Sequence, residues 1–212
     1  MIEVHHLNNS RSQRVLWMLE ELGTPYTVVR YERDPKTMLA PPELKKIHPL
    51  GRSPVIKDGD FVLAESGAII EYLVERYGAG RFVPARGTRE YETCRYWVHY
   101  AEGSLMMQQL VKIYLSRIGE PAKALAERVD GAVRMHLEYI ESSLGASQFL
   151  TGSAFTVADV QMSFPLEVCA AQGLLGGAHP QLSALLTRLH ARPAYQAALA
   201  KGGPYAYAKE GG

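Results

Sequence analysis

The hydrophobic pattern of this chain changes its period once. Over residues 1–78, strand-like runs alternate with helix-like runs, whereas from residue 88 onward the apolar residues recur only at helical spacing. Alternation of this kind within a short segment predicts a small mixed sheet covered by helices. We therefore expect an α/β domain over residues 1–78, a linker over residues 79–87 and an all-α domain over residues 88–212.

The expected elements of the first domain follow the order βαβ, α, ββ, α. They lie near residues 2–7, 12–23, 26–31, 43–48, 55–57, 61–63 and 66–77. The dipeptide Asp58-Gly59 favours a tight hairpin between the last two strands, and Gly78 is expected as the C-cap of the last helix. The expected helices of the second domain lie near residues 88–116, 121–144, 156–172, 180–191 and 193–201.

Composition narrows the classes of function. The net charge is +1 and no long charge block occurs, so neither nucleic acid nor a membrane surface is expected as a partner. No apolar run is long enough to span a membrane, and the polar residues near the start leave no room for a signal-peptide core. Two cysteines give neither a disulfide framework nor metal-ligand spacing, so we expect no metal and a cytoplasmic location.

A dense polar turn, Asn8-Asn9-Ser10-Arg11-Ser12, separates the first expected strand from the first expected helix. Free backbone N–H groups and the helix dipole favour an anion at such a junction. An N-cap role would account for Ser10 or Ser12 alone. It does not account for the whole polar set, so we interpret this loop as functional.

Two further junctions carry polar residues. Proline at a strand entrance, as in Ser53-Pro54-Val55, often marks a cis peptide bond, and the backbone of Val55 could then pair with an extended peptide. Ser66 begins an expected helix, where it could bind a carboxylate or act only as a cap. The polar loop and these two junctions fall along one side of an α/β sheet, where ligands usually bind.

The second domain contains one sharp local signal. Thr156 and Asp159 have the spacing of a capping box, in which each side chain bonds the other residue's backbone N–H. We therefore predict that Asp159 is a buried helix cap rather than a catalytic acid.

Together, the turn over residues 50–55, the pair Glu65-Ser66, the linker and the capping box resemble the glutathione S-transferase family. The resemblance covers essentially all 212 residues. It implies a thioredoxin-like domain followed by a helical domain, glutathione as co-substrate, a small hydrophobic electrophile as second substrate, and a homodimer.

The resemblance also implies roles for single residues. Pro54 would be the cis-proline after Ser53, and the backbone of Val55 would pair with the cysteinyl unit of glutathione. Glu65 and Ser66 would hold the γ-glutamyl end. Arg52 would lie near the glycyl carboxylate, although a solvated surface charge is the alternative for this residue.

The residue that activates the thiol is less clearly marked. Tyr26 and Cys94 come too late in the chain to match the tyrosine and cysteine classes. Ser10 falls at the serine of theta- and delta-like transferases and is the first candidate, while Asn9 falls at the zeta-like serine and is the second. His6 or a backbone N–H remains as a further alternative. Any such donor would stabilise a thiolate, which attacks an electrophilic carbon or a peroxide oxygen.

The sequence gives only a weak signal for the site that binds the electrophile. Met106, Leu110 and Tyr114 could line one face of a helix, but such a stripe more often belongs to a core. Three functions therefore stay open: glutathione conjugation with peroxidase activity, another glutathione-dependent reaction such as isomerisation, and a non-catalytic protein-interaction or ligand-binding module.

Overall fold

The computed structural model describes residues 1–208, which divide into two compact units. Unit 1 comprises residues 1–83 together with residues 189–208, and unit 2 comprises residues 84–188. This division differs from the sequence-based one, which assigned the whole of residues 88–212 to the helical domain. The physical reason lies in the last helix, which packs against the first one.

Unit 1 is built on a four-stranded mixed sheet. Its strands are β1 (Ile2–Leu7), β2 (Tyr26–Tyr31), β3 (Val55–Asp58) and β4 (Phe61–Ala64), arranged in the order β2-β1-β3-β4. β1 and β2 are parallel, whereas β3 is antiparallel to both β1 and β4. The expected α/β fold is thereby confirmed, and so is the hairpin at Gly59, whose positive φ of 66° suits a two-residue turn.

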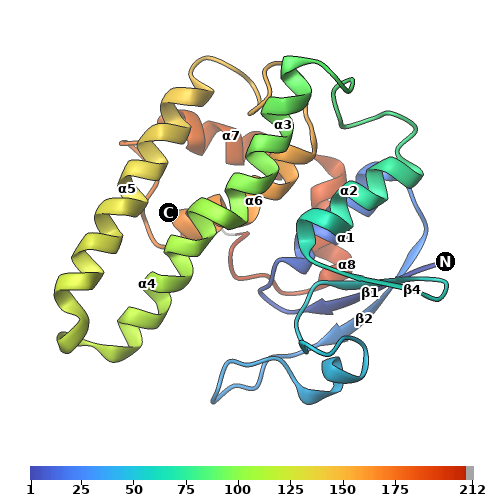
Figure 1. Ribbon diagram of the computed structural model, residues 1–212, viewed down its shortest axis with the longest axis horizontal. Helices are drawn as coiled ribbons and strands as arrows, with labels where there is room; N and C mark the ends of the chain where they lie inside the picture. Colours follow the sequence, from blue (N-terminus) through green and yellow to red (C-terminus); the bar gives the residue numbers. More distant parts are fainter. Residues whose placement is uncertain (209–212) are drawn as a thin grey trace. The chain divides into compact units, whose positions relative to one another are not determined.

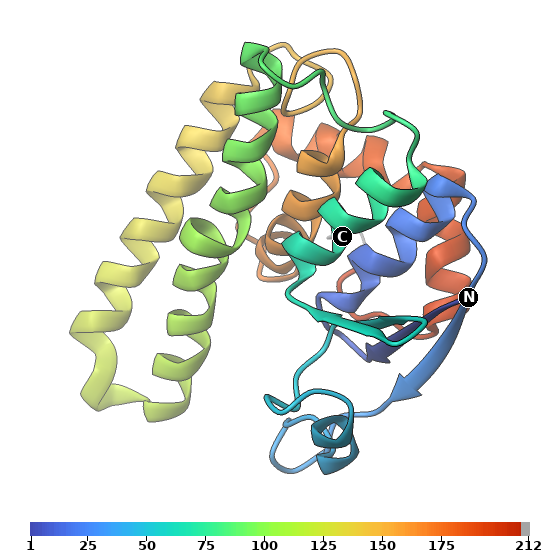
Figure 2. The same cartoon turned by 45° about the vertical axis from the view of Figure 1, so that its right-hand side comes forward.

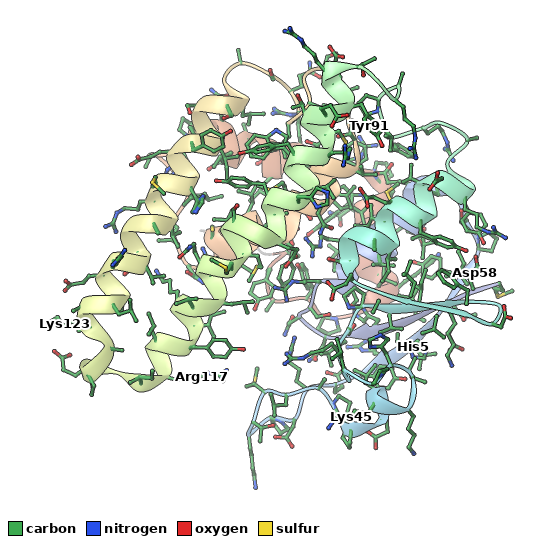
Figure 3. The ribbon with its side chains drawn as sticks, viewed as in Figure 1. His5, Lys45, Asp58, Tyr91, Arg117 and Lys123 are labelled. Atoms are coloured by element: carbon green, nitrogen blue, oxygen red, sulfur yellow. The ribbon has the colours of Figure 1, made fainter. Side chains whose placement is uncertain are left out.

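Three helices lie together on one side of this sheet, and the segment between β2 and β3 lies on the other (Figure 1, Figure 2). The helices are α1 (Ser12–Leu22), α2 (Ser66–Tyr77) and α8 (Pro193–Gly202). The segment on the other side contains Lys45 (Figure 3) within a single 3₁₀ turn, Pro42–Lys46. The short helix expected near residues 43–48 is therefore only this tighter turn.

The apolar residues of α1 make it the central helix of unit 1. Val15, Leu16 and Trp17 are fully buried. The Trp17 ring meets Tyr195 of α8 edge to face, with 5.2 Å between ring centroids. A Cβ at Gly202 would come within 2.8 Å of Gln13 Oε1, so a glycine at this position lets the end of α8 approach α1 closely.

Gly23 and Gly78 end their helices with different backbone conformations. Gly23 adopts the left-handed conformation, with φ 68°, and its N–H bonds the carbonyl of Glu20. Gly78 is the C-cap of α2 as expected, but its φ is −84°. The left-handed residues come next, at Ala79 and Gly80.

Unit 2 contains α3 (Arg89–Tyr100), α4 (Met107–Ile118), α5 (Lys123–Leu144), α6 (Val157–Ala171) and most of α7 (Pro180–His190). The single helix expected near residues 88–116 is interrupted by a π-helical turn, Ala101–Met106. Among residues 1–208, no helix is both long and apolar enough to cross a membrane.

The capping box at the start of α6 is present as predicted. Asp159 is fully buried and accepts hydrogen bonds from the N–H groups of Thr156 (2.8 Å) and Leu150 (2.9 Å). Burial raises the pKa of Asp159 to about 6, although these donors lower it. The structural role predicted for Asp159 is confirmed.

We expect Asp159→Ala to lower the free energy of unfolding by about 3 kcal/mol at neutral pH, because two buried N–H donors lose their acceptor. Urea denaturation followed by circular dichroism measures this loss. Glu127→Ala, on an exposed position of α5, is the control and should change stability by less than about 0.5 kcal/mol. Unchanged stability in Asp159→Ala would contradict the structural role.

Candidate functional site

The polar loop of residues 8–11 connects the carboxyl end of β1 to the first turn of α1. Its first residue is tied to β2, since Asn8 N–H donates to the Tyr31 carbonyl at 3.1 Å. Asn9 follows with a positive φ of 48°, a conformation that asparagine tolerates better than most residues. The loop therefore has a defined backbone conformation.

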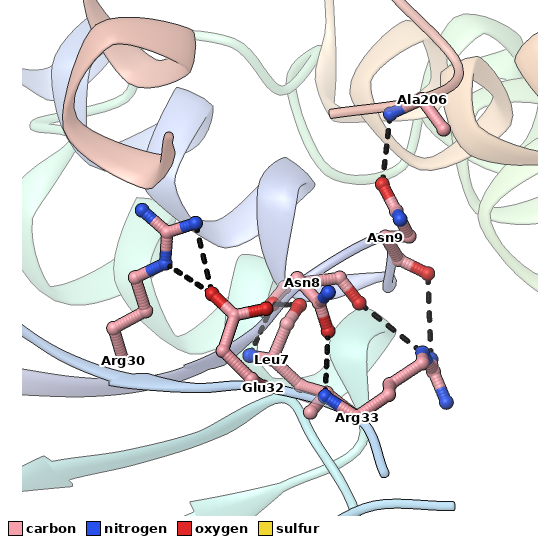
Figure 4. Close-up of polar contacts among 8 residues, drawn as sticks. Leu7, Asn8, Asn9, Arg30, Glu32, Arg33 and Ala206 are labelled. Atoms are coloured by element: carbon pink, nitrogen blue, oxygen red, sulfur yellow. Dashed lines mark hydrogen bonds and ion pairs between the residues drawn. The ribbon is translucent and has the colours of Figure 1, made fainter. Parts of the chain in front are cut away.

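Arg33, just beyond β2, fixes this loop from outside (Figure 4). Its guanidinium donates to the carbonyls of Asn8 (3.2 Å) and Asn9 (3.3 Å), and its backbone N–H donates to Asn8 Oδ1 (3.0 Å). Burial of the guanidinium lowers the pKa of Arg33. Arg33 was not predicted from the sequence, because nothing in the local pattern links position 33 to position 9.

A chain of hydroxyl groups runs beneath the loop. Ser10 Oγ lies 2.7 Å from Ser12 Oγ, which lies 2.8 Å from His6 Nδ1. All three side chains are buried. The His6 ring also forms a hydrogen bond with the backbone of Gly202, and this bond raises the pKa of His6. Burial and the charge of Arg30 nevertheless lower the pKa of His6 to about 4.

The direction of the hydrogens in this chain follows from the neutral ring. A neutral imidazole has a single N–H, and donating it to the Gly202 carbonyl leaves Nδ1 as an acceptor for the Ser12 hydroxyl. Ser12 Oγ can then accept from Ser10. In this arrangement the only hydroxyl hydrogen of Ser10 points into the protein.

The turn over residues 50–55 is attached to the end of β1. Ser53 Oγ donates to the His5 carbonyl (2.9 Å) and accepts from the Leu7 N–H (3.2 Å); β1, which carries His5, is seen in Figure 3. The Ser53–Pro54 peptide bond is cis, as expected. Val55 is buried and lies opposite His5 on β1.

The start of α2 is held by a buried cation. Arg14 Nη2 donates to Ser66 Oγ at 2.8 Å, and both side chains are less than 4% exposed. Glu65, with a φ of 69°, occupies the N-cap position and is exposed. The positive end of the α2 dipole and the guanidinium therefore act together near Ser66. Arg14 was not predicted as a site residue either, although a charged residue within the apolar run of α1 is a signal that could have identified it.

The other residues predicted for the site are Arg52 and the three residues proposed to line the electrophile site. Arg52 is exposed and has no hydrogen bond or ion pair with residues 1–208. Met106 is buried within the π-helical turn, whereas on α4 Leu110 is half-buried and Tyr114 is exposed. Within the same described range, no group of three metal-ligating side chains is found.

Comparison with known proteins gives consistent matches. The profile described as Glutathione S-transferase, N-terminal domain matches residues 1–75, and the corresponding C-terminal domain profile matches residues 103–193. Glutathione S-transferase 3 of Schizosaccharomyces pombe is 36% identical over 183 residues, covering 78% of this chain and 73% of that protein. Glutathione S-transferase 1 of Saccharomyces cerevisiae is 33% identical, with 79% and 80% covered.

Solved structures agree with these matches. A glutathione S-transferase from Actinobacillus pleuropneumoniae superposes with a TM-score of 0.88 at 35% identity, covering 97% of this chain and 94% of that one. A glutathione transferase from Phanerochaete chrysosporium, solved with oxidized glutathione, has a TM-score of 0.79 at 27% identity, with 95% and 96% covered. The expected fold, a thioredoxin-like domain followed by a helical domain, is confirmed.

Because the His6 ring is buried in its neutral form, we expect the protein to lose stability in mild acid. Its pKa of about 4 lies below the unfolded value of 6.5, so below pH 6.5 the unfolded chain takes up the proton first. Between pH 7 and pH 5, His6 should remove about 2 kcal/mol from the free energy of unfolding. Urea denaturation at the two pH values measures the change.

His6→Asn is the matched variant, because the amide oxygen can still accept from Ser12 but does not titrate. Between pH 7 and pH 5, the free energy of unfolding of this variant should fall by about 2 kcal/mol less than that of the unchanged protein. Burial also lowers the pKa of His5. Because His5 is present in both proteins, its contribution to the pH dependence of stability cancels when the two are compared. Equal pH dependence in the two proteins would contradict the assignment.

Proposed function

This chain belongs to the glutathione S-transferase family of enzymes, and we propose that it binds glutathione in unit 1, stabilises the thiolate and transfers it to a small hydrophobic electrophile. The observation that carries the proposal is the buried Arg14–Ser66 pair at the start of α2. The Arg14 guanidinium is buried and lies beside the N-terminus of α2. It provides a favourable position for a carboxylate.

The γ-glutamyl end of glutathione is proposed to lie at Ser66 and Glu65. The Ser66 hydroxyl accepts from Arg14, and a hydroxyl group can accept one hydrogen bond and donate its hydrogen to a ligand carboxylate at the same time. The carboxylate of Glu65 is exposed and suits the ligand's α-ammonium group. This arrangement gives both charged groups of the glutamyl unit a partner.

The rest of the peptide is proposed to follow the cis turn. Ser53 fixes the turn to β1, and the backbone of Val55, next to cis Pro54, would pair with the cysteinyl unit. Arg52 is exposed nearby and would meet the glycyl carboxylate. The oxidized glutathione bound in the Phanerochaete relative supports a ligand of this kind.

The sulfur is proposed to lie at the polar loop before α1. Lowering the thiol pKa by about two units requires about 2.7 kcal/mol of preferential thiolate stabilisation. One side-chain donor, together with the dipole of α1, supplies energies of this order. The proton can leave to solvent, so no general base is needed.

The hydrogen-bond network moves our proposal for this donor from Ser10 to Asn9. Family position favours Ser10, but its hydroxyl lies in the buried chain to Ser12. Asn9 is half-buried, and its Nδ2 group has no hydrogen-bond partner within residues 1–208. A carboxamide N–H can stabilise a thiolate without carrying a charge.

The same thiolate would reduce a hydroperoxide by attacking one oxygen and breaking the O–O bond, which gives glutathione sulfenic acid and, once the leaving oxygen takes up a proton, an alcohol. A second glutathione would then attack the sulfenic sulfur and give glutathione disulfide and water. We further propose a detoxifying role in the cytoplasm and a homodimer, with Tyr72, Tyr91 and Arg95 as candidate interface residues. Met106, Leu110 and Tyr114 are proposed for the electrophile. The family relationship does not favour the alternative of a non-catalytic module.

Retention on immobilised glutathione, elution by free glutathione and conjugation of chlorodinitrobenzene test the proposal as a whole. We expect all three. A protein that passes through the column and leaves the substrate unchanged would contradict the proposed function.

Ser66→Ala should weaken glutathione binding about tenfold, because a hydrogen bond to a carboxylate contributes about 1.5 kcal/mol or more. Isothermal titration calorimetry measures the affinity at a temperature where circular dichroism shows the variant folded. Ser142→Ala on α5 is the control and should bind as the unchanged protein does. Lower thermal stability with unchanged affinity would reduce Ser66 to a structural role.

Asn9→Asp should raise the pKa of the bound thiol by about 1 unit or more, since the donor is lost and a negative charge is added. Turnover should fall about threefold or more at neutral pH and recover at high pH. The ultraviolet absorbance of the thiolate, titrated against pH, gives the pKa directly.

Ser10→Ala is the comparison and should shift the thiol pKa less. The reverse order would return the role to Ser10. If neither variant shifts the pKa, activation must come from backbone N–H groups and the helix dipole.

A further inference from the structure

The C-terminal segment of residues 203–208 returns to the polar loop of unit 1. The N–H of Ala206 donates to Asn9 Oδ1 at 2.7 Å (Figure 4). Tyr205 beside it is 9% exposed and meets Tyr207 edge to face, with centroids 5.5 Å apart. The segment is thus held by side-chain burial as well as by this hydrogen bond.

The contact determines which way the Asn9 carboxamide faces. A backbone N–H can only donate, so the atom opposite Ala206 must be the amide oxygen. The Nδ2 group must then point away from the segment. An asparagine without such a partner could rotate or exchange its two ends at little cost.

The backbone of the same residue is fixed independently. Arg33 donates to the carbonyl of Asn9 at 3.3 Å and to that of Asn8 at 3.2 Å. Arg33, just beyond β2, holds the backbone of the loop, and Ala206 in the C-terminal segment holds the side chain of Asn9. The position and the orientation of Nδ2 are therefore set by two segments far from it in sequence.

We propose that the C-terminal segment is a positioning element for thiolate stabilisation: the Ala206 N–H holds the Asn9 carboxamide so that Nδ2 donates to the glutathione sulfur. This inference rests on the proposed function, because it requires glutathione to bind at the loop. Ala206 acts through Asn9 and does not itself contact the sulfur.

Ala206→Pro removes the donor with little other change. Ala208 N–H bonds the Tyr205 carbonyl at 3.4 Å, which makes Ala206 the second residue of a four-residue turn. Proline is favoured at this position of common turns and has no N–H. Ala206→Gly keeps the N–H at the same site and is the control, and an Asn9→Ala background separates the lost donor from the difference in backbone flexibility between glycine and proline.

The readout is the pKa of the bound thiol, from thiolate absorbance, with the glutathione dissociation constant measured in parallel. Ala206→Pro should raise the thiol pKa by about 0.5 unit relative to Ala206→Gly, which from a pKa of about 6.5 lowers the thiolate fraction at pH 7 about 1.5-fold, and leave the dissociation constant unchanged. In an Asn9→Ala background the same change should have no effect, because the group that it orients is gone.

An equal shift in both backgrounds would overturn the proposal, since the segment would then act elsewhere. No shift in the presence of Asn9 would overturn it as well. A chain ending at Tyr205 also lacks the Ala206 N–H and replaces the proline variant if that variant does not fold. Failure of the unchanged protein to bind glutathione or lower its thiol pKa would instead refute the proposed function.

Discussion

The hydrogen bond from the Arg14 guanidinium to the Ser66 hydroxyl lies in the interior of unit 1 and joins α1 to α2. Taking a guanidinium out of water is costly, and it is tolerated only where nearby groups accept its N–H donors. Two residues earlier on the same helix, the buried Ser12 hydroxyl bonds His6 Nδ1 and accepts from the Leu7 N–H. The first turn of α1 is thus polar and buried at once, and Ser12 and Arg14 each bond a group on a neighbouring element.

This arrangement links stability to the proposed chemistry. The same helix turn presents Arg14 toward the proposed glutamyl site and lies directly after the loop that would receive the sulfur. Because the polar groups are already oriented by buried contacts, little reorganisation is needed when a charged ligand binds. The neutral state of His6 is part of the arrangement, since a protonated ring could not accept from Ser12.

The end of the chain adds a second constraint. α8 packs on α1 through Tyr195, and Arg192 forms an ion pair with Glu21 at 2.6 Å. These contacts return residues 189–208 to the sheet-containing unit and bring Ala206 to Asn9. Thus the loop conformation depends on residues at both ends of the sequence.

The sequence by itself determined the features that depend on local periodicity and turn chemistry. The strand and helix order, the hairpin at Gly59 and the Asp159 cap are of this kind, because neighbours along the chain decide them. The π-helical turn, the burial of Arg14, the clamp by Arg33 and the return of Ala206 to Asn9 were decided only in the tertiary structure. Each joins groups that are distant in sequence or depends on how a side chain packs, and no local pattern records which buried donor will meet which acceptor.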